Sequence, residues 1–159
     1  MTPLAWIVGL VLPACGYSGV QGLPTPQWMD TAHIVRPSSP NTSLAAPAGF
    51  DPTPDIPTPP YKAAPDRLFI VVRQAAASQP RTYEAAVFPD RLQAHYVART
   101  ALLNFPDLVT AQVQPNGAGG STLILYSRSV YGYGDLGVNH RRVVAWLTAI
   151  DSHFPSSER

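Results

Sequence analysis

The sequence predicts an α+β fold, in which an antiparallel sheet of three to four strands packs against two helices behind a proline-rich extended N-terminal segment. Three observations lead to this prediction. Apolar residues recur at helical spacing just after Pro65 and again near the C-terminus, and they alternate in several short runs between these two places. Proline is concentrated in the first part of the chain, where 13 of the 18 prolines lie at or before Pro65.

Residues 1–15 are predicted to be a signal peptide with a lipobox-like end. The apolar run at residues 4–12 is shorter than the roughly 20 residues that span a bilayer, and it has the length of a signal-peptide core. The run ends in Leu12-Pro13-Ala14-Cys15, which resembles a bacterial lipobox, whose cysteine receives a lipid. We expect Cys15 to be lipidated, and an ordinary secretory signal is the alternative.

A lipidated Cys15 places the protein on the periplasmic side of the bacterial cell envelope, with the membrane as a partner through the lipid anchor. Gly16 follows the cysteine where an aspartate could stand, which resembles lipoproteins that are sent on to the outer membrane. We therefore expect the outer membrane rather than the inner one. Because Cys15 is the single cysteine, an intramolecular disulfide is excluded.

Residues 16–65 are predicted to form a proline-rich tether that is partly docked on the domain. Neither a strand period nor a helical period persists there, and proline recurs with Ser, Thr, Gly and Ala, which favours polyproline II. The segment is either a semi-rigid spacer that holds the domain off a membrane or a disordered leader without a function. The apolar residues that indicate partial docking are Trp28, Ile34, Val35, Phe50 and Tyr61.

The folded domain is predicted at residues 66–155, and it begins with a helix. Pro65-Asp66 suits a helix start, because proline is tolerated in the first turn and an acid interacts favourably with the helix dipole. A helical stripe follows at Leu68, Val71, Val72, Ala75 and Ala76. The β-branched run at residues 70–72 favours a strand instead, but the alanines at 75–77 and the breaker Pro80 favour the helix.

Four runs are then predicted as strands, at residues 82–88, 92–98, 108–114 and 121–130. Pro89-Asp90 marks a tight turn between the first two, and residues 115–120, rich in glycine, form a hairpin loop by composition. Residues 99–104 could also be helical. The last helix carries an apolar stripe at Val143, Leu147, Ile150 and Phe154, and residues 156–159 are a polar tail.

Composition argues against several classes of function. The formal net charge is +1 and there is a single lysine, so the clustered cations of a nucleic-acid-binding protein are absent from the sequence. The four histidines show no metal-ligand spacing, and no nucleophile elbow or phosphate loop is present. We expect no nucleic acid, no metal and no cofactor.

One segment carries a family signature. Residues 127–139 read Ser-Arg-Ser-Val-Tyr-Gly-Tyr-Gly-Asp-Leu-Gly-Val-Asn and are followed by Arg141-Arg142-Val143. This run, together with the upstream Phe105-Pro106-Asp107, resembles the bacterial and plastid "domain of unknown function 1499" family over about residues 66–154. The resemblance implies a fold neighbourhood and brings no established activity.

The same segment can be interpreted physically. Asn139 is a good helix N-cap, and Arg141 and Arg142 would then lie in the first turn, where positive charge opposes the helix dipole by about 0.3–1 kcal/mol each. One interpretation is a structural loop around Gly137, in which Asp135 pairs with Arg128, Arg141 or Arg142. The other is an anion-binding site formed by the helix N-terminus with Arg128 and Arg142.

These interpretations lead to two functions. The first is a non-enzymatic, membrane-tethered interaction or small-ligand-binding protein. The alternative is an enzyme of unrecognised type, with Asp135 as acid or base and with Arg128 and Arg142 holding an anionic substrate. A buried, unpaired Asp135 would favour the enzyme, whereas an Asp135 saturated by hydrogen-bond donors would favour the structural loop.

Overall fold

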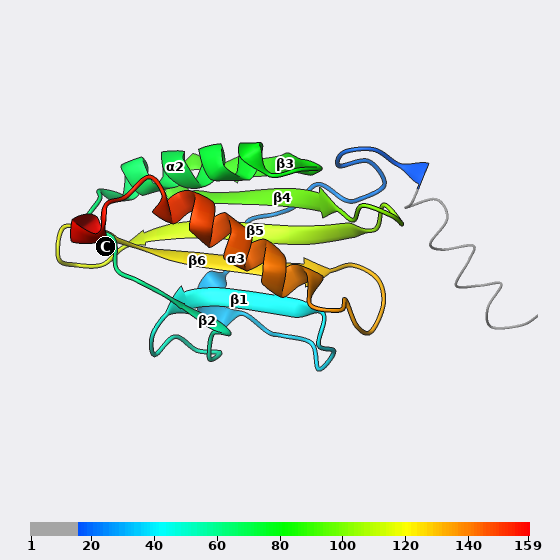
Figure 1. Cartoon of the computed structure of the whole chain (residues 1–159), viewed down its shortest axis with the longest axis horizontal. Coiled ribbons are helices and arrows are strands. Elements are labelled where there is room, and N and C mark those ends of the chain that lie inside the picture. The colour runs from blue at the N-terminus through cyan, green and yellow to red at the C-terminus, as the bar shows by residue number, and fades with distance from the viewer. Residues whose placement is uncertain (1–15) are drawn as a thin grey trace, which may run out of the picture.

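The computed structural model describes residues 16–159, so Cys15 and the predicted signal peptide lie outside the described residues. Six strands form one sheet in the order β2-β1-β6-β5-β4-β3, as Figure 1 shows. The strands are β1 (Thr42–Pro47), β2 (Ile56–Thr58), β3 (Thr82–Phe88), β4 (Gln93–Arg99), β5 (Pro106–Pro115) and β6 (Ser121–Ser129). All neighbours are antiparallel except β1 and β2. The predicted α+β class is confirmed, but the prediction of three to four antiparallel strands is wrong, because the sheet is mixed and larger.

The two additional strands come from the segment predicted as a tether. β1 pairs along β6, with Leu44 opposite Tyr126, and β2 then lies parallel to β1 at the sheet edge. Pro57 in β2 is tolerated because an edge strand leaves one side of its backbone unpaired. The sequence Thr-Ser-Leu-Ala-Ala-Pro of β1 shows no alternation, since four consecutive residues of it are buried. The fold therefore begins well before Asp66.

The four strands predicted after Pro80 are confirmed as β3 to β6. The helices are confirmed as α2 (Pro65–Ser78) and α3 (Val138–Asp151), so the β-branched run at 70–72 is helical. Residues 99–104, for which a helix was the alternative, are not helical, because Arg99 ends β4 and residues 100–105 form the loop between β4 and β5. Three short 3-10 turns complete the described elements: η1 (Thr31–His33), η2 (Pro89–Arg91) and η3 (Ser156–Glu158).

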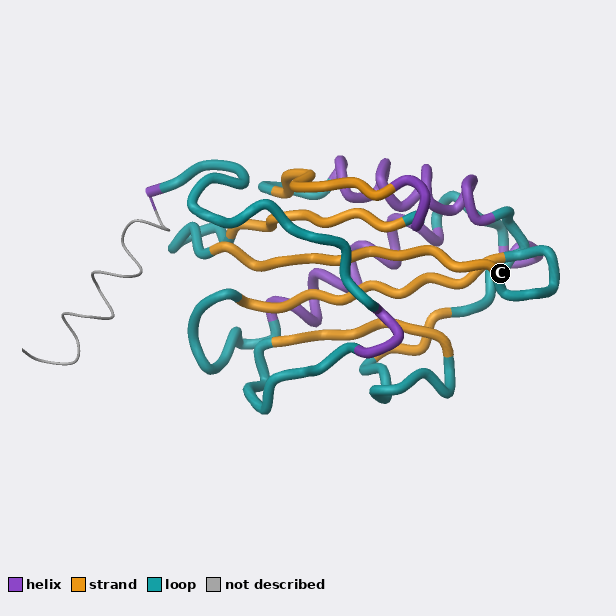
Figure 2. Tube along the Cα trace, turned by 180° about the vertical axis from the view of Figure 1, so that it is seen from behind, coloured by secondary structure: helices purple, strands orange, loops and turns teal. Residues whose placement is uncertain are grey.

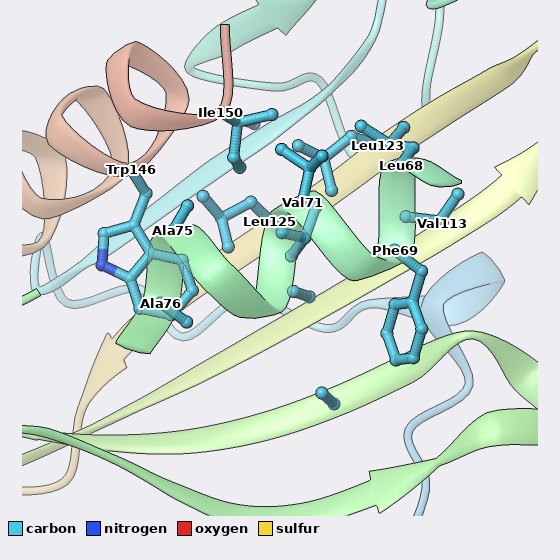
Figure 3. Close-up of a cluster of buried hydrophobic side chains, with 14 of the residues drawn as sticks. Leu68, Phe69, Val71, Ala75, Ala76, Val113, Leu123, Leu125, Trp146 and Ile150 are labelled. Atoms are coloured by element: carbon cyan, nitrogen blue, oxygen red, sulfur yellow. The ribbon is translucent and has the colours of Figure 1, made fainter. Parts of the chain in front are cut away.

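The main core lies between the sheet and the two helices, which cover the same face (Figure 1). Trp146 of α3 is fully buried and packs edge-on against Tyr96 of β4, with ring centroids 5.2 Å apart. Leu68 of α2 and Leu125 of β6 are also fully buried in this cluster (Figure 3). Burial of apolar surface of this kind contributes about 25 cal/mol per Å2 and is the main force that holds the helices on the sheet.

The N-terminal segment crosses the opposite face of the sheet (Figure 2). It is fixed there by Gln93, a fully buried residue whose Oε1 accepts from the Met29 amide at 2.6 Å and whose Nε2 donates to the Met29 carbonyl at 2.8 Å. Nearby, the Arg91 guanidinium lies 3.8 Å from the Trp28 ring centroid. Ile34 is buried with Tyr126 in a second apolar cluster on this side.

Two loops and the start of the described chain meet at one end of the sheet. These are residues 100–105, residues 130–137 and residues 16–22, and both Figure 1 and Figure 2 show them at the same end. The hairpin at residues 116–120 and the C-terminus lie at the other end. We call the first end the loop end. Within residues 16–159, no helix has both the length and the hydropathy to cross a bilayer.

Candidate functional site

Asp135 holds the start of α3. One oxygen of its carboxylate accepts from the Gly137 amide at 2.9 Å, and the other accepts from the Asn139 amide at 2.7 Å. The backbone of Gly137 has a φ of +75°, a left-handed conformation that suits glycine, and it turns the chain into the helix. Gly137 therefore occupies the N-cap position and the Asp135 carboxylate supplies the acceptor for the first amides, so the prediction that Asn139 is the N-cap is wrong.

Asn139 instead points into the protein, where its side chain is fully buried. Its Nδ2 donates to the Asn41 carbonyl at 2.9 Å and to the Asp135 carboxylate at 2.7 Å. Its Oδ1 accepts from the Ser127 hydroxyl at 2.6 Å and from Arg142 at 2.7 Å. One amide thus links α3 and its leading loop to β6 and to the residue that precedes β1.

Arg142 closes this network with a buried ion pair. Its guanidinium lies 2.6 Å from the carboxylate of Asp107 in β5, and the two side chains are only 12% and 3% exposed. Burial raises the pKa of Asp107 above its usual range, although the Arg142 charge and a hydrogen bond from Ser129 act in the opposite direction. We call Asn41, Asp107, Ser127, Ser129, Asp135, Asn139 and Arg142 the Asn139 network.

Asp135 is ionised within this network without an arginine partner. Burial by itself would raise its pKa, but the hydrogen bonds from the Asn139 amide and side chain and from the Gly137 amide outweigh burial, so the pKa is lowered. Among the described residues, none of the ion pairs that we expected between Asp135 and Arg128, Arg141 or Arg142 is present.

The three arginines have separate surroundings. Arg142 faces Asp107, and Arg141 donates to the Leu136 carbonyl at 2.9 Å. Arg128 is exposed on β6 and makes no ion pair with any residue in the 16–159 range. The helix N-terminus already holds the Asp135 carboxylate, so the geometry favours the structural loop over the anion-binding site.

A pocket lies beside the network, between the loops at 100–105 and 130–137. Its volume is about 670 Å3, and Thr100, Asp107, Ser129 and Asp135 contribute polar groups to its wall. The rings of Phe105 and Tyr131 lie on its two loops with their centroids 6.4 Å apart. The apolar part of the wall includes Leu102, Leu103, Phe105, Tyr131, Leu136 and Val138.

The described residues do not form a metal centre, because no group of three or more His, Cys, Asp or Glu side chains lies together among them. The two carboxylates at the pocket are both engaged, Asp107 by Arg142 and Asp135 by the start of α3. Neither is a free general base of the kind that the enzyme hypothesis requires.

Sequence analysis missed Asn41 and the pairing of Asp107 with Arg142. Asp107 was visible within the Phe-Pro-Asp element, but the sequence contains no signal for which arginine it meets. Asn41 lay in the segment taken for a tether. The pocket had one available signal, the pair Leu102-Leu103 inside a loop that connects two strands, where apolar residues are unusual.

The Asn139 network predicts a large stability loss for Asn139→Ala. This change leaves the Asn41 carbonyl, the Ser127 hydroxyl and the Arg142 guanidinium with fewer partners, so we expect the free energy of unfolding to fall by about 3 kcal/mol. Urea unfolding followed by circular dichroism measures it. The exposed neighbour His140→Ala is the control, and equal losses for the two variants would contradict a structural role for Asn139.

The lowered pKa of Asp135 predicts how the free energy of unfolding depends on pH. Because its pKa is lower in the folded than in the unfolded protein, its contribution to stability is full above the unfolded value of about 4 and is lost as the pH falls through the folded value. The stability difference between the wild type and Asp135→Asn should therefore be full near pH ~6 and shrink below pH ~4. Unfolding curves at several pH values measure this difference, and a constant difference would contradict the assignment.

Comparison with known proteins confirms the family that the sequence resembles. The model of the family described as "Protein of unknown function (DUF1499)" matches residues 34–150. A search of the curated proteins finds no match for the chain. The matched range starts ahead of β1 and therefore includes both strands that the resemblance, placed at about residues 66–154, had left out. Because the match covers most of the sequence, from Ile34 to Ile150, the chain belongs to this family of proteins of unknown function.

Proposed function

We propose that the protein is a lipid-anchored, non-enzymatic binding protein of the bacterial cell envelope, whose domain holds an amphipathic small molecule at the loop end. The observation that carries this proposal is the pocket of about 670 Å3. Ligand sites typically have volumes of about 300–1,000 Å3, with mainly apolar walls and a few polar groups that orient the ligand. The pocket beside the Asn139 network has this composition.

The polar groups in the wall restrict the ligand. The charge of Asp107 is compensated by Arg142, whereas Asp135 makes no ion pair among the described residues, so an anionic head group beside Asp135 would be repelled while a hydroxyl or amine could donate to either carboxylate. The arginines of the sequence suggested an anionic ligand, whereas the carboxylates in the wall favour a neutral or cationic one. We propose a ligand with a hydrocarbon body and a neutral or donating head.

The same geometry supports binding rather than chemistry. The carboxylate of Asp135 accepts three hydrogen bonds, from two backbone amides and from the Asn139 side chain. A carboxylate that accepts three hydrogen bonds is a weak proton acceptor, and its lowered pKa is consistent with that, while roughly one of its four lone-pair sites remains for a ligand donor. The proposal assigns Asp135 to the frame of the pocket.

Ligand binding predicts a difference between two matched variants. Leu103 lines the pocket and is 59% exposed, whereas Ile70 on α2 is 56% exposed and is not part of the pocket wall. Leu103→Asp puts a charge against the hydrocarbon body of the ligand, and we expect occupancy to fall by about tenfold, equivalent to ~1.4 kcal/mol. Ile70→Asp should bind as the wild type does.

This occupancy is measured by native mass spectrometry. The full chain is mixed with 1-dodecanol in detergent micelles and released from them in the spectrometer, and the fraction of protein that carries the alcohol is recorded. Dodecanoate, which has the same hydrocarbon body and an anionic head, should bind more weakly than the alcohol. Absence of dodecanol from the wild type, or equal occupancy in Leu103→Asp and Ile70→Asp, would contradict the binding function.

The lipid anchor makes a separate prediction. Because Cys15 is the single cysteine, Cys15→Ala removes the only thiol that can accept a lipid. The mass of the variant protein should therefore lack the mass that an attached lipid adds to the wild type. Cell fractionation should show loss from the outer-membrane fraction, with Ser18→Ala as the control. Unchanged fractionation and an unchanged mass would contradict the anchor.

A further inference from the structure

The loop end exposes large apolar side chains that the fold does not use. Leu102 is 95% exposed at the tip of the loop between β4 and β5, and Leu136 is 93% exposed in the loop that leads into α3. Tyr133 is 75% exposed and Leu103 is 59% exposed in the same two loops. Leu102, Leu103 and Leu136 also line the pocket, so its opening lies among them. We call Leu102, Leu103, Tyr133 and Leu136 the apolar rim.

The N-terminal segment enters the domain at this same end. The Tyr17 carbonyl accepts from the side chain of Asn104 at 2.8 Å. Two further carbonyls, of Gly19 and Gln21, accept from the Arg99 guanidinium at 2.8 Å each. Asn104 belongs to the loop that carries Leu102, so residues 17–21 lie beside the rim. In the sequence, Cys15 and the apolar run at residues 4–12 come before this segment.

This attachment leaves little room for a spacer. A semi-rigid spacer was one of the two alternatives for residues 16–65, but residues 17–21 are bonded to the loop end, and residues 42–47 and 56–58 are strands of the sheet. A lipid on Cys15 would lie two residues from Tyr17. An anchor at this position brings the loop end of the domain to the membrane.

The charge of the loop end fits an anionic surface. Residues 79–82, 99–107 and 128–142 contain five arginines and two aspartates. Both aspartates are engaged inside the protein, Asp107 by Arg142 and Asp135 by the start of α3. Arg81, Arg128 and Arg141 are exposed. Exposed cations next to apolar side chains are typical of surfaces that bind anionic lipid head groups.

We propose that the loop end is a membrane-binding face, in which the apolar rim enters the head-group region of an anionic bilayer and the pocket opens toward the lipid. The inference uses the proposed anchor only for the direction of approach, because the rim and its arginines supply their own affinity for the bilayer. It gives the pocket a source of amphipathic ligands, since a molecule in the outer part of the bilayer reaches the opening without crossing water.

An environment-sensitive fluorescent amino acid, introduced by codon suppression, tests the face without using thiols. It replaces Leu102 or Leu136 in the full chain, which is reconstituted in vesicles of phosphatidylethanolamine and phosphatidylglycerol. Both positions are almost fully exposed, so the substitutions leave the core intact. Controls are Ala118, in the hairpin at the opposite end, and Ile70, on the exposed side of α2.

We expect emission at positions 102 and 136 to shift to the blue and to be quenched several-fold more by nitroxide-labelled lipids than emission at 118 and 70. Reversal of charge in the triple variant Arg81→Glu, Arg128→Glu, Arg141→Glu should reduce the quenching at 102. Equal quenching at all four positions would overturn the proposal, as would a blue shift at 102 and 136 without quenching by lipid, which would indicate contact with another copy of the protein.

The membrane face and the proposed binding function can fail separately. If dodecanol binds but the rim remains in water, the pocket stands and the membrane face is wrong. If the rim is quenched by lipid but dodecanol does not bind, the membrane face stands and the proposed ligand is wrong.

Discussion

The structure depends on one buried amide. The Asn139 side chain donates hydrogen bonds to the residue ahead of β1 and to the loop that leads into α3, and it accepts hydrogen bonds from β6 and from Arg142. Arg142 in turn connects the network to β5. Burying the charges of Arg142 and Asp107 is costly in itself, and such a pair is compensated only where the remaining donors and acceptors are satisfied. The Asn139 network supplies these partners. It thereby fixes the loop at 130–137 against the start of β5, and the pocket is the space between this loop and the loop at 100–105 that leads into β5.

Much of the fold could be predicted from periodicity. Both helices and the four strands from β3 to β6 follow from apolar spacing, because each has a face or a pair of faces against the core. β1 and β2 could not be predicted in this way. Ala45 and Ala46 are buried on a strand without alternation, and Pro57 would argue against any strand other than one at an edge. β1 is stabilised by pairing with β6 and β2 by pairing with β1, and no local sequence pattern indicates these pairings.

The sequence drew attention to the segment that contains Asp135 and Asn139, but it did not indicate the hydrogen bonds and ion pairs that these side chains and Arg142 make. The segment around Asp135 and Asn139 stood out because it concentrates polar residues and glycines. Asn139 was expected to be the N-cap, and Asp135 was expected to pair with an arginine. Because the helix starts at Val138, Asn139 lies inside the first turn, and the Asp135 carboxylate accepts from the amides of Gly137 and Asn139. Arg142 meets an acid that lies 35 residues earlier in the chain, on a neighbouring strand of the sheet. Pairings of this kind are set by tertiary structure, as is a pocket built from two separate loops.

The position of β1 between β2 and β6 has a consequence for biogenesis. Thr42 of β1 is paired with Arg128 of β6, so the first strand of the sheet has its antiparallel partner in the last one, about 86 residues later. Contacts so distant in sequence carry a large loop-closure entropy and slow the folding of a domain. The sheet cannot be completed until the C-terminal part of the polypeptide has left the ribosome. During synthesis, β1 therefore remains without its antiparallel partner until almost the whole chain has been made.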